Sequence, residues 1–293
     1  MSDRLGDVGG IRQRLLEAGY VADDLIADVL FLADSMDKPL LVEGPAGVGK
    51  TELAKATAAL SGSRLLRLQC YEGLDEAKAL YEWNYKKQLL RIQADEGLSW
   101  QETEASIFTE DFLLERPVLA AIRAPDPVLL LIDEVDRLEV ETEALLLEVL
   151  SDFQVSIPEL GTVIARQSPL VILTSNATRE LSDALKRRCL YLHLSYPGAE
   201  REQQIIELRV PGIKPALAGQ AALVVRALRA LDLEKPPSIA ESVDWARSLV
   251  LLGVTDVDSP ALGRTLPVLL KNFRDQEMAT AELDLSSAVT RGR

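Results

Sequence analysis

The sequence predicts an α/β fold built on a buried parallel sheet, followed by a smaller domain made of helices. Short apolar runs typical of buried strands occur at 39–42, 128–132 and 169–174. The first leads through a glycine-rich loop into a helical pattern, an order characteristic of units that build parallel sheets. Beyond residue 197 the pattern becomes helical. We therefore expect an α/β domain at 1–197 and an α-helical lid domain at 198–293.

The glycine-rich loop has the spacing of a phosphate-binding loop, glycine, four residues, glycine, lysine and threonine. Its glycines let the backbone N–H groups curl around a phosphate, and a helix N-terminus favours negative charge there. Leu53, Thr57 and Leu60 predict the helix, which Gly62 ends. The residues expected to bind nucleotide are Gly44, Pro45, Ala46, Gly47, Val48, Gly49, Lys50, Thr51 and Glu52. Lys50 is predicted to reach the β- and γ-phosphates of ATP, and Thr51 to ligate Mg²⁺.

Polar residues follow the next two apolar runs. The run 128–132 ends in Asp133 and Glu134. Asp133 is placed to hold magnesium, and Glu134 to orient or deprotonate an attacking water, which favours hydrolysis over simple phosphate transfer. The run 169–174 leads to Asn176, whose amide could bond the γ-phosphate or that water.

Composition narrows the class of protein. The 293 residues carry a formal charge of −14, which argues against a surface made for nucleic acid but leaves room for a local basic patch. Cys70 and Cys189 are expected to be reduced structural thiols, and the lone His193 is expected to be structural, so magnesium is the only metal expected. No apolar run has the length of a membrane helix and no signal-peptide core is present, so we expect a cytoplasmic protein without membrane insertion.

These motifs together resemble those of AAA+ ATPases. In that resemblance Gly44 to Thr51 is Walker A, 129–136 is Walker B, Asn176 is sensor 1, and Arg187 or Arg188 is the arginine finger. The stretches LQCYEGLD (68–75), YEWNY (81–85) and TSNATREL (174–181) are similar to the MoxR type, especially its CoxD-like branch. The basic triplet at 186–188 could by itself be a solvated turn.

The resemblance implies a P-loop AAA+ core with a central parallel sheet of five strands. It also implies a homo-oligomer, a hexameric ring with ATP at its interfaces. It also implies a chaperone that matures a metalloenzyme of the molybdenum-copper carbon monoxide dehydrogenase type, together with a von Willebrand factor A domain partner. It further implies a helix-2 insert at about 71–98 and a pre-sensor-1 hairpin at about 153–166. Tyr81, Trp83 and Tyr85 alternate and would share one face of a strand, either to grip a client or to be buried.

The helical domain should contain two amphipathic helices. The first is predicted by Leu217, Ala221, Val224, Leu228 and Leu231, and the second by Ile239, Val243, Ala246 and Val250. Ser238 and Glu241 form a capping box for the second helix. No sensor-2 arginine stands near its start, where the chain reads Ile-Ala-Glu, and Arg247 lies too far along. This departure puts signalling from lid to phosphate in doubt.

Two other classes of function remain open. A nucleic-acid motor or loader is disfavoured by the acidic balance, and a nucleotide-gated adaptor with little turnover is disfavoured by Glu134 and Asn176. A small-molecule P-loop kinase is a more distant alternative, because it needs neither finger nor lid.

Overall fold

The computed structural model describes residues 4–94 and 107–291, so residues 95–98 of the predicted insert lie outside the described part. The chain forms two compact units. A sheet unit comprises Met1–Ala18, Ala22–Gly44 and Lys50–His193, and a helical unit comprises Gly19–Val21, Pro45–Gly49 and Leu194–Arg293. The chain passes for the last time from the sheet unit to the helical unit after His193.

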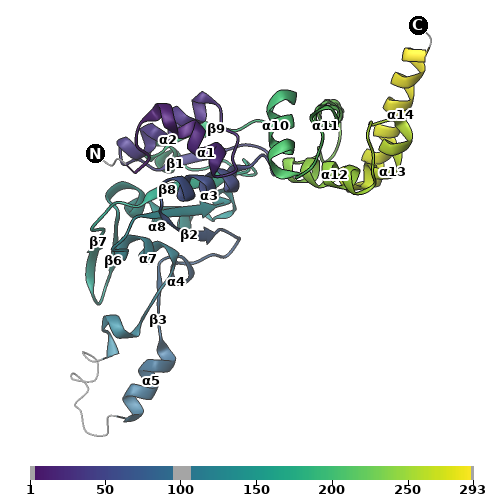
Figure 1. The fold of residues 1–293 in the computed structure, drawn as a ribbon. Coiled ribbons are helices and arrows are strands. Elements are labelled where there is room, and N and C mark those ends of the chain that lie inside the picture. Colours follow the sequence, from purple (N-terminus) through teal and green to yellow (C-terminus); the bar gives the residue numbers. More distant parts are fainter. Residues whose placement is uncertain (1–3, 95–106, 292–293) are drawn as a thin grey trace. The chain divides into compact units, whose positions relative to one another are not determined.

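Five parallel strands form the central sheet in the order β2 (Arg64–Gln69), β5 (Val128–Asp133), β8 (Leu170–Ser175), β1 (Leu40–Glu43) and β9 (Leu190–His193) (Figure 1). This confirms the predicted five-stranded parallel sheet. Every residue of β5 and of β8 is buried, which is why these strands read as continuous apolar runs instead of alternating patterns. The strands that carry the predicted polar tips are therefore the best-shielded ones in the sheet.

Alternate residues of the strands face two different layers of helices. Leu130, Ile132, Val171 and Leu173 belong to a core shared with α7 (Pro117–Arg123) and α8 (Val140–Asp152). Helix α2 (Asp24–Ser35) contacts β9, α3 (Lys50–Leu60) contacts β2, β5 and β8, and α1 (Val8–Glu17) packs against both of these helices. Residues 18–23 separate α1 from α2, so two helices precede the first strand. Helix α3 is the predicted helix of the phosphate loop, ended by Gly62 at φ +62°.

Two hairpins extend from this layer. Strands β6 (Gln154–Ile157) and β7 (Gly161–Ile164) pair antiparallel, as predicted for 153–166. Within the insert predicted at about 71–98, α4 (Glu76–Ala79) precedes β3 (Tyr81–Trp83). The partner strand β4 (Leu113–Glu115), which follows η1 (Glu110–Phe112), lies beyond the expected end of the insert at 98.

The prediction that Tyr81, Trp83 and Tyr85 alternate along one strand is wrong for Tyr85. Tyr85 begins helix α5 (Tyr85–Ala94) instead of continuing β3, because the N–H of Lys87 is bonded by the Asn84 side chain, a cap that starts a helix. Trp83 is buried with its ring edge-on to Tyr81 and to Phe108, whereas Tyr85 is 61% exposed. Burial therefore accounts for Trp83.

The helical unit confirms both predicted amphipathic helices. They are α11 (Pro215–Arg229) and α12 (Ile239–Leu251), and Leu231 lies just beyond α11. Both halves of the Ser238–Glu241 capping box are present. The other helices are α10 (Ala199–Arg209), α13 (Ser259–Leu269) and α14 (Phe273–Arg291). Their shared core centres on the fully buried Trp245, whose indole N–H donates to Thr265 Oγ1 at 2.8 Å.

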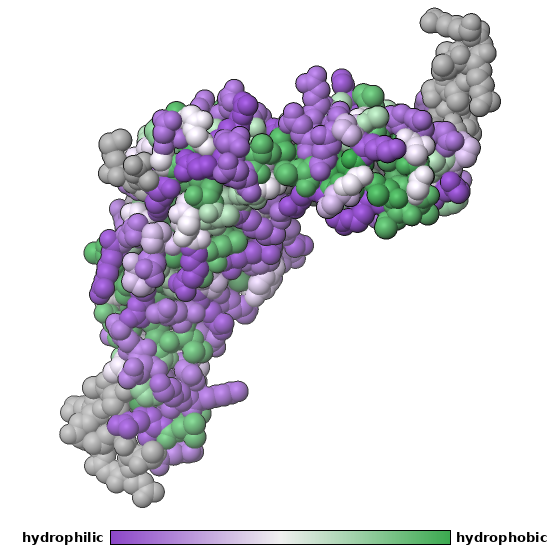
Figure 2. Space-filling view, viewed as in Figure 1, coloured by the Kyte–Doolittle hydropathy of each residue, from purple (hydrophilic) through white to green (hydrophobic). Residues whose placement is uncertain are grey.

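Hydrophilic residues cover most of the visible face of the sheet unit, and green patches lie near α5 (Figure 2). On α5 the apolar side chains of Leu89, Leu90 and Ile92 are exposed. Within the described residues, every helix is too short or too polar to cross a bilayer.

Candidate nucleotide site

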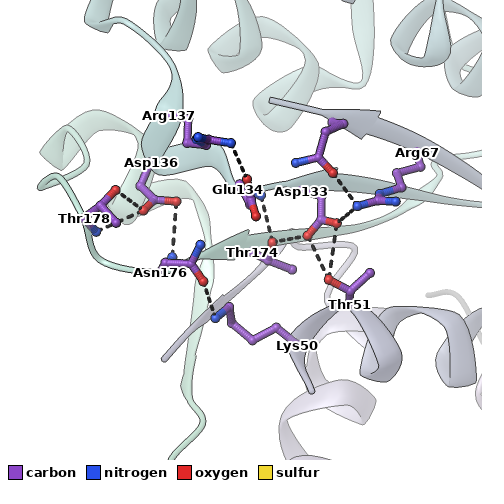
Figure 3. Close-up of polar contacts among 11 residues, drawn as sticks. Lys50, Thr51, Arg67, Asp133, Glu134, Asp136, Arg137, Thr174, Asn176 and Thr178 are labelled. Atoms are coloured by element: carbon purple, nitrogen blue, oxygen red, sulfur yellow. Dashed lines mark hydrogen bonds and ion pairs between the residues drawn. The ribbon is translucent and has the colours of Figure 1, made fainter. Parts of the chain in front are cut away.

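The topology of the sheet explains why the predicted polar residues meet. Strand β8 lies between β1 and β5, and the carboxyl ends of parallel strands share one edge of the sheet. In register, Glu43 of β1 stands beside Ser175 of β8, and Gln69 of β2 beside Asp133 of β5. Lys50, Thr51, Asp133, Glu134 and Asn176 consequently lie at the same edge of the sheet (Figure 3).

The phosphate loop has the backbone conformation that its glycines predict. Gly47 and Gly49 have φ values of +73° and +97°, where a β-carbon would be strained. Within the helical unit, Gly47 lies against the start of α12: its carbonyl accepts the N–H of Ile239 at 3.1 Å. Tyr196 Oη donates to the Ala46 carbonyl at 3.0 Å. Hydrogen bonds to the carbonyl groups of Ala46 and Gly47 thus stabilise the conformation of the loop.

Lys50 begins α3 and is almost fully buried. Its Nζ donates to the Gly44 carbonyl at 2.7 Å and to Asn176 Oδ1 at 2.8 Å. Desolvation lowers the pKa of Lys50, while the carboxylates of Asp136, Asp133, Glu134 and Glu43 act in the opposite direction. Two protein oxygens thus hold the buried ammonium group of Lys50 beside the start of α3.

The carboxylate of Asp133 is buried and surrounded by donors. Thr51 Oγ1 lies 3.1 and 3.2 Å from its two oxygens, and Thr174 Oγ1 donates to Oδ1 at 2.5 Å. Arg67 forms an ion pair with Oδ2 at 2.5 Å, and its guanidinium also donates to Gln69. The predicted metal residues Thr51 and Asp133 are therefore adjacent.

Glu134 adopts a left-handed backbone conformation, with φ +59° and ψ +49°. This conformation is uncommon for a residue with a side chain and is typical of functional positions. It is held by a hydrogen bond of 2.9 Å from the Glu134 N–H to Thr174 Oγ1. The Glu134 side chain is 36% exposed and forms an ion pair of 3.0 Å with Arg137 of η2 (Val135–Arg137). A carboxylate is thus presented at the end of β5 without being buried.

The loop that carries Asn176 is fastened from two sides. Asp136 accepts the backbone N–H groups of Asn176 and Thr178 at 3.2 and 3.0 Å and the Thr178 hydroxyl at 2.6 Å. Buried Glu143 of α8 pairs with Arg179 and accepts the N–H of Ser182 at 3.1 Å. The backbone of the loop that carries Asn176 is therefore positioned by Asp136 and by α8.

The two arginines expected as a finger differ in their surroundings. Both end the short helix α9 (Asp183–Arg188). Arg188 donates to Ser151 Oγ and, at 2.9 Å, to the Ala184 carbonyl. Arg187 is exposed and makes no hydrogen bond or ion pair with the part of the chain that the structure describes. Arg187 is the one of this pair whose guanidinium is available to another molecule.

Several of the remaining predicted residues have structural roles. Val48 is buried, and Glu52 pairs with Lys55 on the exposed side of α3. Burial raises the pKa of both Cys70 and Cys189 to about 12, as suits unreactive thiols. In the helical unit Arg247 pairs with Asp244.

An arginine does lie beside the start of α12, but it comes from α11. Arg229 donates to the Pro237 carbonyl at 2.8 Å, pairs with buried Glu202 and stacks 4.2 Å over the Tyr196 ring. Sequence reasoning looked for such a residue on α12 itself and missed it, because only folding brings α11 to that position.

The donor set fits ATP with magnesium. Mg²⁺ prefers oxygen ligands and binds through one or two carboxylates plus substrate phosphates, which the Thr51 hydroxyl and Asp133 carboxylate match. Among the described residues there is no group of three or more His, Cys, Asp or Glu that could hold a metal without such help. The glycine loop and Lys50 supply the donors that a polyphosphate requires.

Sequence reasoning did not single out Arg67, Thr174, Asp136 or Arg137 as site residues. A signal existed for two of them. Thr174 is the only hydroxyl residue within the apolar run 169–174, and Asp136 lies three residues after Asp133 in the Walker B stretch. Arg67 gave no signal, because only the pairing of β2 with β5 brings it to Asp133.

A nucleotide-binding P-loop fold is the class that this sheet and site define, and solved structures agree. The chain is similar to a point mutant of RuvB from Thermotoga maritima, with a TM-score of 0.52, 17% identity and coverage of 85% of this chain and 71% of that one. A second mutant of the same RuvB gives a TM-score of 0.50 at 20% identity, covering 85% and 70%. At such identities the likeness shows the AAA+ fold alone.

The family follows from the sequence match. Residues 39–189, more than half of the chain, match the AAA domain of the dynein-related subfamily, and the protein belongs to that family. The chain is 25% identical to the uncharacterized protein SH1500 of Staphylococcus haemolyticus, over 86% of this chain and 92% of that protein. It is 27% identical to the uncharacterized protein SAB1265c of Staphylococcus aureus, over 59% and 61%.

Proposed function

We propose that the protein is a magnesium-dependent ATPase that remodels a protein client. The observation that carries the ATPase assignment is the meeting of Lys50, Thr51, Asp133, Glu134 and Asn176 at one edge of the sheet. A protein that binds nucleotide without hydrolysing it would need the phosphate loop. It would need neither an exposed carboxylate such as Glu134 nor an amide held in place such as that of Asn176.

Each residue has a role in this proposal. Lys50 and the loop N–H groups bind the phosphates, and Thr51 with Asp133 would hold the metal. Bound Mg²⁺ would neutralise charge on the phosphates. Glu134 accepts a proton from the attacking water, and Asn176 orients that water or the γ-phosphate. The Glu134 side chain pairs with Arg137, whereas the Asp133 carboxylate is bonded by Thr51, Thr174 and Arg67, so we assign the two carboxylates different tasks.

Assembly completes the proposed site. Members of this fold class commonly form rings, and we propose a homo-oligomer, in the hexameric form that the MoxR resemblance implies, in which Arg187 reaches the γ-phosphate bound by a neighbour. A supplied arginine of this kind accelerates hydrolysis by about 10³–10⁵ in systems where it is known. The exposure of Arg187 and the engagement of Arg188 support this choice.

The client proposal rests on the resemblance to the MoxR type and its CoxD-like branch. We propose a cytoplasmic chaperone that matures a molybdenum-copper metalloenzyme together with a von Willebrand factor A domain protein. The net charge of −14 supports a protein client over a nucleic acid.

The test is a trap variant. Glu134→Gln should leave ATP bound but unhydrolysed, and proteins that copurify with it from the source cells are identified by mass spectrometry. Glu139→Gln, an exposed carboxylate at the start of α8, is the matched control. Enrichment of a von Willebrand-type protein and a metalloenzyme subunit over the control supports the proposal. Enrichment of DNA or replication proteins would replace it with a loader, and unchanged hydrolysis in Glu134→Gln would refute the catalytic assignment.

A further inference from the structure

Arg67 is the donor on Asp133 whose role the nucleotide motifs do not explain. It lies in β2, two residues before the strand ends, and its guanidinium reaches across to the end of β5 (Figure 3). The Asp133 side chain is 3% exposed and the Arg67 side chain 48% exposed. A buried carboxylate thus has a counter-cation that enters from the solvent side.

The other donors on Asp133 cannot leave easily. Thr174 is buried, donates to Asp133 and accepts the Glu134 N–H, so its hydroxyl is fixed at both ends. Thr51 is the predicted metal ligand and lies within 3.2 Å of both carboxylate oxygens. Arg67 alone of these donors has a long, half-exposed side chain and an alternative polar partner, Gln69, beside it.

A guanidinium and a magnesium ion make competing demands on one carboxylate. The carboxylate carries one negative charge and about four acceptor positions. Magnesium carries two positive charges and demands a strict octahedral arrangement of oxygens, usually including several waters that themselves need acceptors. With Arg67 on Oδ2, the two cations would repel each other at short range in a poorly solvated site.

We propose that Arg67 is a resident counter-cation that competes with Mg²⁺ for Asp133, so that metal entry requires its guanidinium to move off the carboxylate. This inference rests on the proposed function, since it assumes that Thr51 and Asp133 form the magnesium site. Arg67 keeps Asp133 neutralised before metal arrives and sets the concentration of Mg²⁺ at which the site becomes loaded.

The test measures magnesium affinity directly, apart from hydrolysis. The full chain is saturated with a fluorescent ADP analogue in EDTA, and Mg²⁺ is titrated at low ionic strength for wild type, Arg67→Gln and Arg64→Gln. Arg64 begins the same strand, opposite Val128 and away from the site, and serves as the matched control. Arg67→Gln should bind Mg²⁺ on the order of tenfold more tightly, with a gain that shrinks as salt rises. Arg64→Gln should match wild type.

Several outcomes would overturn the inference. Unchanged or weaker Mg²⁺ binding in Arg67→Gln would mean that Arg67 stays and cooperates with the metal. A crystal structure of the Mg–ADP complex with Arg67 still bonded to Asp133 would do the same. If Arg67→Gln does not fold, Arg67→Lys replaces it and should shift affinity in the same direction by less, because an ammonium lacks the guanidinium fork. If wild type does not bind the analogue with Mg²⁺, the proposed function itself is wrong. That result differs from failure of the Arg67 inference alone, in which wild type binds Mg²⁺ and Arg67→Gln gains no affinity.

Discussion

Asp136 fixes the backbone of Asn176: its carboxylate oxygen accepts the Asn176 N–H at 3.2 Å, across forty residues of sequence. The other oxygen accepts both donors of Thr178. One buried carboxylate thus determines where the loop after β8 presents its amide, and links the segment after β5 to that loop.

Replacing Asp136 should therefore slow hydrolysis without preventing binding. Asp136→Ala should lower kcat at least about tenfold, because a misplaced amide loses its orientation toward the reacting groups. The Kd for ATP should change less than about threefold, since Lys50 and the loop remain. Steady-state kinetics and nucleotide titration check this, with exposed Asp152→Ala as control. A rise in Kd with unchanged kcat would contradict it.

Asp136 should also contribute to stability in a pH-dependent way. Desolvation by burial raises its pKa, but hydrogen bonds from Thr178 and Asn176 outweigh this and hold the pKa below 3.8. A carboxyl group whose pKa is lower in the folded than in the unfolded protein stabilises the fold at pH values above its unfolded pKa. That contribution is lost as the pH falls through its folded pKa. The free energy of unfolding of wild type should exceed that of Asp136→Asn by about 1–3 kcal/mol at neutral pH. Urea unfolding should show this difference shrinking only below pH 3.8.

Lys50 and Lys55 provide a matched pair on α3. Lys50 is buried among backbone and Asn176 acceptors, whereas Lys55 pairs with Glu52 at the surface. Lys50→Ala should weaken ATP binding about a hundredfold, because charge-assisted bonds to two phosphates are lost. Lys55→Ala should bind like wild type. Isothermal titration calorimetry measures both, and equal losses would argue against a phosphate role for Lys50.

Gly47 should tolerate no side chain. A β-carbon there would lie 2.3 Å from Ser238 Cβ at a φ of +73°. Gly212 has a φ of +83° with nothing within 4 Å, so Gly212→Ala carries the backbone strain without the clash. Gly47→Ala should abolish nucleotide binding and should lower Tm more than Gly212→Ala does. For Gly212→Ala we expect the free energy of unfolding to fall by about 1–2 kcal/mol. Nucleotide binding by Gly47→Ala equal to that of Gly212→Ala would be evidence against this packing.

Substitutions of Arg187 and of Arg188 should have different effects on the kinetics of ATP hydrolysis. Arg187→Gln should lower kcat of the assembled protein about 10³-fold while leaving ATP affinity intact, since its proposed role is to neutralise charge at a neighbour's γ-phosphate. Arg188→Gln loses contacts to Ser151 and Ala184 and should mainly reduce stability. The reverse pattern would make Arg188 the finger.

The cysteines should be unreactive in the folded protein. A pKa of about 12 leaves almost no thiolate at Cys70 or Cys189 under mildly alkaline conditions. A thiol reagent under those conditions should label neither residue until denaturant is added, and then both. Rapid labelling of native protein at either position would show that its burial is incomplete.

Local chemistry made much of this protein predictable. The loop Gly44 to Thr51 is specified by glycines that must take positive φ and by a lysine and threonine at fixed spacing. The strands β5 and β8 were predictable because burial on both faces leaves a continuous apolar run. The capping box of α12 is equally local, since its partners are three residues apart.

The fold class, the phosphate loop and the carboxylate and amide at the strand ends could therefore be predicted from the amino-acid sequence, because each depends on neighbours within one element. Tertiary structure alone decided that Arg67 pairs with Asp133, that Asp136 holds Asn176, and that Arg187, not Arg188, has an available guanidinium. Those relationships depend on strand order, register and helix packing. Such contacts join residues tens of positions apart, and no periodicity along the chain encodes them.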